Sequence, residues 1–175
     1  MKVFLMTVTQ KQTSERKQKK KSPTATTPGI DDHNMQAIGV GIDTARYGHH
    51  VTFLREDKQP ACPAITVMET RTGYQQLRTQ IEALHQRFPN AQIYVRIDAA
   101  GQYAANLENF LRTFTHLPLS ISVGEPKRNK DYHAAHSPKR QSDATESHAM
   151  ARYAVVERPK ESHGTPPEFA VLRRV

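Results

Sequence analysis

The apolar residues between positions 37 and 157 follow two periods, which together predict five strands and three helices. Alternation of small or apolar residues with others predicts strands, and apolar residues three or four positions apart predict amphipathic helices. The expected strands cover residues 37–43, 47–54, 64–69, 91–98 and 119–123, and the expected helices cover residues 72–88, 106–114 and 143–157. Two of these strands, 37–43 and 91–98, each run through apolar residues into an aspartate.

The order of these elements is three strands, a helix, a strand, a helix and a strand, followed by a later helix. This order predicts an α/β protein of the ribonuclease-H-like fold, a mixed sheet of about five strands with helices on its faces. In that fold the acids that end the first and fourth strands lie side by side.

The composition outside these elements predicts one folded unit with polar flanks. Residues 1–36 contain a Lys/Gln tract and a Ser/Thr/Pro stretch, so we expect a disordered basic arm there. The folded domain is expected over residues 37–158, and residues 159–175 are expected to be a linker or a truncated connector. Within the domain, residues 127–140 are expected to form a basic loop.

The net positive charge of the chain predicts a polyanionic partner for this domain. The 175 residues carry a formal net charge of +8, with a pI of about 9.7 and a mean hydropathy of -0.70. Nucleic acid is therefore the leading partner class, and the alternative is an inert basic surface with a charged tail. One cysteine, Cys62, excludes an internal disulfide framework and a thiolate zinc cluster. With no apolar run of membrane-spanning length and no signal peptide, we expect a cytoplasmic protein that does not interact with a membrane.

Four acidic residues form the candidate catalytic and metal-binding set. Asp43 and Asp98 end two strands, while Asp143 and Glu146 lie three positions apart and so share one face of the last helix. Carboxylates of this kind favour Mg²⁺ or Mn²⁺, and two such ions can support phosphoryl transfer. Taken singly, each acid is better explained as a solvated strand end or as a favourable charge in the first turn of a helix, and only the set of four in this element order favours a metal site.

Four short segments, read in order, resemble the N-terminal domain of the DEDD transposases of the insertion-sequence one-ten family. They are Gly39-Val40-Gly41-Ile42-Asp43, Arg96-Ile97-Asp98-Ala99-Ala100-Gly101-Gln102-Tyr103, Gly124-Glu125-Pro126 and Lys139-Arg140-Gln141-Ser142-Asp143-Ala144-Thr145-Glu146-Ser147. The resemblance covers about residues 37–160 and implies a RuvC-like fold. The family commonly has Glu second and Asp fourth, so the order D-D-D-E departs from its pattern at Asp98 and Glu146.

The resemblance also implies a function and partners. These would be DNA transposition with a structured guide RNA, homo-oligomers of the full-length protein, and a place in the bacterial cytoplasm near the nucleoid. The family carries a second, C-terminal domain whose serine attacks DNA, and the 175 residues do not extend to it. We therefore expect a truncated copy or one piece of a split product. Two alternatives stay open, a standalone resolvase-type nuclease and a non-catalytic nucleic-acid-binding module.

The basic loop expected at residues 127–140 supplies the candidate nucleic-acid contacts. These are Lys127, Arg128, Lys130, Tyr132, Lys139 and Arg140. The cations could hold phosphates and Tyr132 could stack on a base. The alternative is a solvated loop that offsets the nearby carboxylates. His133, His136 and His148 match no zinc-binding spacing and are expected at the surface.

Overall fold

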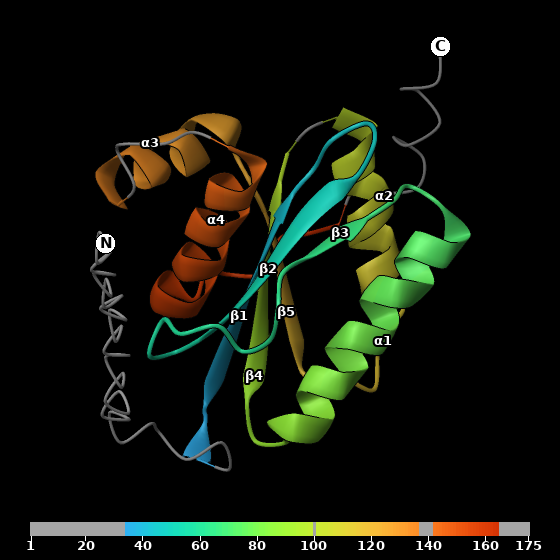
Figure 1. Cartoon of the computed structure of the whole chain (residues 1–175), viewed down its shortest axis with the longest axis vertical. Helices are drawn as coiled ribbons and strands as arrows, with labels where there is room; N and C mark the ends of the chain where they lie inside the picture. Colours follow the sequence, from blue (N-terminus) through green and yellow to red (C-terminus); the bar gives the residue numbers. More distant parts are fainter. Residues whose placement is uncertain (1–33, 100, 137–141, 165–175) are drawn as a thin grey trace, which may run out of the picture.

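Five strands form one mixed sheet in the order β3-β2-β1-β4-β5 (Figure 1). The strands are β1 (Ala37–Asp43), β2 (His49–Arg55), β3 (Ile65–Val67), β4 (Gln92–Asp98) and β5 (Leu119–Gly124). β2 is antiparallel to β1 and to β3, whereas β4 is parallel to β1 and to β5. This strand order, with these directions, confirms the expected α/β class and the ribonuclease-H-like arrangement. The computed structural model describes residues 34–99, 101–136 and 142–164.

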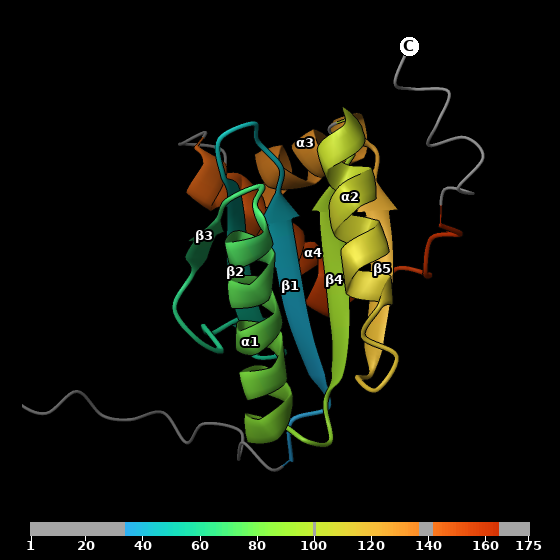
Figure 2. The same ribbon diagram turned by 90° about the vertical axis from the view of Figure 1, so that its right-hand side faces the viewer.

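Helices cover both faces of the sheet. α1 (Arg71–Arg87) and α2 (Gly101–Arg112) lie on one face, and α4 (Asp143–Glu157) crosses the other, with α3 (Pro126–His136) beside it (Figures 1 and 2). Figure 2 shows that the carboxyl ends of β1, β4 and β5 point to one end of the molecule, where α3 and the start of α2 also lie. In the described part of the chain, no helix is both long and apolar enough to span a membrane.

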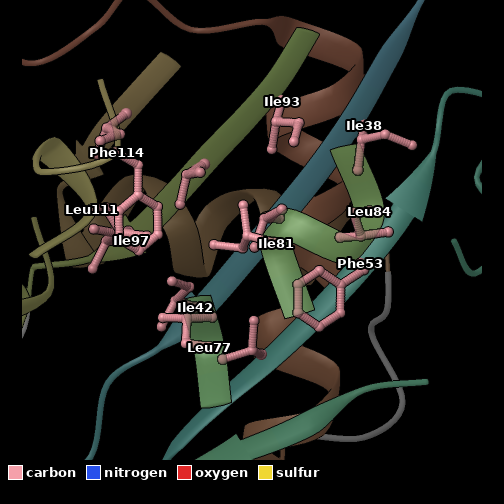
Figure 3. Close-up of a cluster of buried hydrophobic side chains, with 14 of the residues drawn as sticks. Ile38, Ile42, Phe53, Leu77, Ile81, Leu84, Ile93, Ile97, Leu111 and Phe114 are labelled. Atoms are coloured by element: carbon pink, nitrogen blue, oxygen red, sulfur yellow. The ribbon is translucent and has the colours of Figure 1, made fainter. Parts of the chain in front are cut away.

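The main hydrophobic core lies between the sheet and the helix pair α1 and α2. Alternate residues of β1 and β4 point into it, because successive side chains of a strand face opposite sides. Figure 3 shows the cluster, in which the labelled residues are Ile38, Ile42, Phe53, Leu77, Ile81, Leu84, Ile93, Ile97, Leu111 and Phe114. The apolar residues whose spacing predicted a helix at residues 72–88 lie on the face of α1 that packs into this core.

The opposite face of β1 is built from glycines, and this lets α4 approach the sheet very closely. A Cβ on Gly41 would lie 2.0 Å from the Ser147 carbonyl oxygen, and one on Gly39 would lie 2.2 Å from that of Ala151. The small side chains of α4 complete this contact. The Thr52 hydroxyl of β2 meets the Ser147 hydroxyl at 2.9 Å across the interface. The helix axis is therefore held against β1 by backbone rather than by bulky side chains.

Two expectations about elements were wrong. Residues 127–140 were expected to form a loop, yet Pro126–His136 is a helix. It begins with Pro126, whose fixed φ suits a first helical position, and His133 is its only buried residue, so it lacks the apolar stripe that would have revealed it. α2 begins at Gly101 rather than at residue 106. Lys139 and Arg140 lie outside the described residues.

Both described flanks of the expected domain pack on it. Met35, assigned to the basic arm, has no exposed surface and belongs to the core. Ser162, assigned to the connector, donates its backbone N–H to the Ile121 carbonyl (2.8 Å), and its hydroxyl accepts the Val123 N–H (2.7 Å). Residues 1–33 and 165–175, which make up most of the expected arm and connector, lie outside the described residues.

The close approach of α4 generates a first prediction. Gly41→Ala should lower the free energy of unfolding by about 3 kcal/mol or more, because the new methyl group meets helix backbone that cannot move aside alone. Urea unfolding followed by circular dichroism measures it. Ala83→Ser, on the exposed side of α1, should change the stability by less than about 0.5 kcal/mol. A Gly41→Ala protein as stable as the parent would contradict the backbone contact.

Candidate functional site

The two strand-end acids lie side by side on the α4 face of the sheet. β1 and β4 are parallel, and Ile42 pairs with Ile97, so Asp43 and Asp98 are the next residues of adjacent strands. Asp43 follows Gly39 and Gly41 at two-residue spacing and therefore shares their face, which α4 covers. On the other neighbour, β2, His50 is the residue opposite Asp43.

The third and fourth acids belong to the first turn of α4. Ser142 caps this helix with its hydroxyl, which accepts the Thr145 N–H, and the Thr145 hydroxyl in turn accepts the Ser142 N–H. The capping box thus makes Asp143 the first residue of the helix and places both Asp143 and Glu146 in the first turn. Negative charge is favoured there by the helix dipole. The predicted bounds of this helix, 143–157, are confirmed.

The electrostatics of Asp43 show that the four acids are neighbours. Burial of Asp43, followed by the negative charges of Glu146, Asp143 and Asp98, raises the pKa of its carboxyl from 3.8 to about 7. The residue is only 8% exposed. Asp98, Asp143 and Glu146 therefore all lie near enough to Asp43 to oppose its ionisation, and a proton or a cation at Asp43 would offset this repulsion.

The chemistry of this set fits a hard divalent cation, but the side chains are not gathered around one. Four carboxylates are the oxygen donors that Mg²⁺ and Mn²⁺ prefer. Across residues 34–99, 101–136 and 142–164, however, no three histidine, cysteine or acidic side chains form a group that could hold a metal ion. A metal at this site would need side-chain movement from the positions observed.

Asn129 of α3 is a functional candidate that the sequence did not reveal. Its amide Nδ2 donates to the Asp98 carboxylate (2.8 Å), and its Oδ1 accepts the Arg96 Nε–H (3.2 Å). Arg96 is buried, and its guanidinium lies 4.6 Å from the centre of the Tyr153 ring of α4. Asn129 therefore orients Asp98 and joins β4, α3 and α4. An asparagine in a polar stretch carries no sequence signal for such a role.

The candidate nucleic-acid residues on α3 fall into two groups, exposed cations and a packed tyrosine. Lys127, Arg128 and Lys130 are exposed on α3. The ring of Tyr132, in contrast, stacks on His136 (4.2 Å between centroids) and meets Tyr153 edge-on (4.9 Å), so it holds α3 against α4.

The histidine expectation holds only in part. His133 was expected at the surface, but it is 9% exposed, and its Nε2 has no hydrogen-bond partner among the described residues. It is buried because α3 is a helix packed on α4 rather than a solvated loop. His136 and His148 are exposed, as expected.

A second polar cluster, also missed from sequence, supports the turn after Asp43. His49 is fully buried, accepts the Ala45 N–H at Nδ1 (3.3 Å) and lies 2.5 Å from Glu69 through Nε2. Tyr74 and Asn106 also donate to Glu69, at 2.8 and 2.7 Å. Burial would raise the pKa of Glu69, but the bonds from Asn106, His49 and Tyr74 hold it below its ordinary value.

Comparison with solved structures finds similar chains, and RuvC of T. thermophilus is among them. The chain is similar to the structure of T. thermophilus RuvC in complex with a Holliday junction substrate, with a TM-score of 0.43 and 13% sequence identity. The match covers 70% of this chain and 96% of that chain. No family model and no curated protein matches the chain. The strand order and strand directions define the fold, and the side chains of the site define its chemistry.

The raised pKa of Asp43 generates a second prediction. The native state keeps a proton on Asp43 up to about pH 7, whereas the unfolded chain loses it near pH 3.8. Stability from this group is therefore fully present below pH 3.8 and is lost progressively as the pH rises from there to about 7. Between pH 5 and pH 8 in EDTA, the stability of Asp43→Asn relative to the parent should grow by about 1–3 kcal/mol.

Urea unfolding at the two pH values measures this difference. Glu157→Gln, which removes an exposed acid at the far end of α4, should follow the parent at both. A stability difference between Asp43→Asn and the parent that is the same at pH 5 and pH 8 would contradict the raised pKa.

Proposed function

We propose that this chain is a RuvC-like, divalent-metal-dependent domain that acts on phosphodiester bonds of nucleic acid. The observation that carries the proposal is the set of acids from β1, β4 and α4 at the carboxyl ends of β1 and β4, where burial and the charges of three acids raise the pKa of the fourth, Asp43. The exposed cations of α3 lie at the same end of the molecule (Figure 2) and favour a polyanionic substrate.

The four acids Asp43, Asp98, Asp143 and Glu146 would hold the cation. Mg²⁺ or Mn²⁺ bound there would supply Lewis-acid activation of a phosphodiester and of the attacking oxygen. Asp43 gives up its proton to take part, Asp98 is oriented by the Asn129 amide, and the first turn of α4 presents the remaining two carboxylates. Lys127, Arg128 and Lys130 hold the phosphate backbone that leads to the acids.

We assign the domain more specifically to a DEDD transposase of the insertion-sequence one-ten family. This assignment is supported by the four sequence segments that resemble the family, three of which end in or contain the acids of the site. It carries with it DNA as substrate, a structured guide RNA, homo-oligomers of the full-length protein and work in the cytoplasm beside the nucleoid. The serine chemistry would belong to a C-terminal domain.

A second candidate is a nucleic-acid-binding module without catalytic activity. The observation that favours it is that the acids of the described residues are neighbours without forming a group able to hold a metal ion. Binding would then rest on α3, and the acids would only set its local charge. Metal binding and turnover separate the two candidates.

The metal-dependent proposal generates a third prediction. Mg²⁺ or Mn²⁺ at millimolar concentration should raise the melting temperature of the parent and support cleavage of labelled branched DNA or structured RNA. Asp43→Asn and Glu146→Gln should lose the thermal shift and lower turnover by at least about 100-fold, since groups that merely support a metal ligand already contribute 10–100-fold. Glu157→Gln, on the same helix, should behave as the parent.

The outcomes of this experiment are distinct. A parent protein that binds nucleic acid but shows neither a metal-dependent shift nor turnover would support the binding module and reject the catalytic proposal. Turnover that survives Asp43→Asn unchanged would place the chemistry elsewhere.

The exposed cations of α3 generate a fourth prediction. Replacing Lys127, Arg128 and Lys130 by glutamine should weaken duplex binding and lower the slope of log K against log salt by roughly 0.9 for each phosphate that is no longer neutralised. Anisotropy titrations at several salt concentrations measure the slope. Lys58→Gln, which removes an exposed cation in the turn after β2, should leave it unchanged. An unchanged slope in the triple variant would remove α3 from the interface.

A further inference from the structure

We propose that Arg46 and Tyr47, in the turn between β1 and β2, form a stacking site for an unpaired nucleobase beside the four acids. The inference rests on the proposed function and adds a substrate class to it: strands with unpaired bases, rather than fully paired duplex. The ligand chemistry is a nucleobase, which single-stranded DNA and single-stranded RNA share.

The first observation is the exposure of the pair. Tyr47 is 75% exposed, the most exposed large hydrophobic side chain among the described residues. The guanidinium carbon of Arg46 lies 5.2 Å from the centre of its ring. Met68, 48% exposed, adjoins the turn, since a Cβ on Gly48 would lie 3.4 Å from its sulfur. The turn therefore presents an aromatic ring, a cation and adjacent apolar surface to the solvent.

The second observation is that the turn is firmly supported beneath this surface. The Thr44 hydroxyl donates to the Asp98 carbonyl (3.3 Å), and the Ala45 N–H donates to His49, which is fully buried and bonded to Glu69. Tyr74 of α1 and Asn106 of α2 complete the bonds of Glu69. Tyr47 is thus displayed from a turn anchored to both helices on that face, and such preorganisation lowers the entropic cost of binding.

The third observation is the position of the turn. Tyr47 follows Asp43 by four residues, so their Cα atoms are at most about 15 Å apart. The turn lies at the carboxyl end of β1, the end at which α3 also lies (Figures 1 and 2). A strand whose backbone passes from the cations of α3 to the acids would bring a neighbouring base to Tyr47.

The chemistry of the pair favours a base over other partners. An exposed aromatic ring stacks on any base when the base is unpaired, and a nearby guanidinium adds its charge for the adjoining phosphate or its plane for a second base. Tyr132, the residue first expected to stack, is packed between His136 and Tyr153. The net charge of +8 also suits a polyanion.

The test compares the affinity of the full chain for three fluorescently labelled oligonucleotides of one sequence. These are single-stranded DNA, the matched DNA duplex and single-stranded RNA, measured by anisotropy at fixed salt in EDTA. Tyr47→Ala should weaken binding of the single strand about 5–100-fold, since stacking contributes roughly 1–3 kcal/mol per base, and should alter duplex binding less than about twofold. Val156→Ser, which removes an exposed apolar side chain on α4, should leave both unchanged.

A second pair of variants keeps the test valid if Tyr47→Ala unfolds. Tyr47→Phe keeps the ring and should bind as the parent does, whereas Tyr47→Leu keeps apolar area without a π face and should lose affinity. Equal single-strand affinities for these two variants would overturn the proposal. If Tyr47→Ala loses affinity for only one of the two single strands, the result would support the site and identify that nucleic acid, DNA or RNA, as the ligand.

Failure of this inference and failure of the proposed function are distinguishable. A parent that binds nucleic acid, with Tyr47→Ala binding single strands equally well, would overturn the stacking site and leave the proposed function intact. A parent with no salt-sensitive affinity for any of the three oligonucleotides would overturn both.

Discussion

The contact between the glycines of β1 and the backbone of α4 is the constraint on which the site depends. With any side chain at Gly39 or Gly41, the helix would have to move away from the sheet, because a Cβ there falls within 2.2 Å of helix carbonyl oxygens. The first turn of α4 would then carry Asp143 and Glu146 away from Asp43. Close packing and electrostatics are therefore linked, because the close approach of α4 to β1 also brings the acids of α4 near Asp43.

That concentration of charge opposes folding unless something compensates for it. A proton on Asp43 is one compensation, and the pKa of about 7 reflects the burial of this carboxyl together with the charges of its neighbours. A bound cation would be another, and it would act at pH values where the proton is lost. An acidic cluster that weakens the metal-free protein is typical of functional sites, where binding rather than stability sets the choice of residues.

α3 connects this site to the proposed interface. Asn129 bonds Asp98, Tyr132 packs on Tyr153, and the exposed cations face outward from the same short helix. Because α3 buries only His133, its position depends on these polar and aromatic contacts rather than on an apolar stripe. The same helix therefore carries both the cations that would bind a polyanion and the amide that orients Asp98.

The sheet, α1 and α4 were predictable from the sequence, because a buried core imposes apolar periodicity on the chain, and acids at two strand ends and in one helical turn marked the candidate site. The sequence did not determine α3, the early start of α2 or the packing of Met35 and Ser162, since these follow from contacts with distant residues. The bonds of Asn129 to Asp98 and of His49 to Glu69 became visible only in three dimensions, because hydrogen bonds between elements depend on positions in space and leave no periodic trace along the chain.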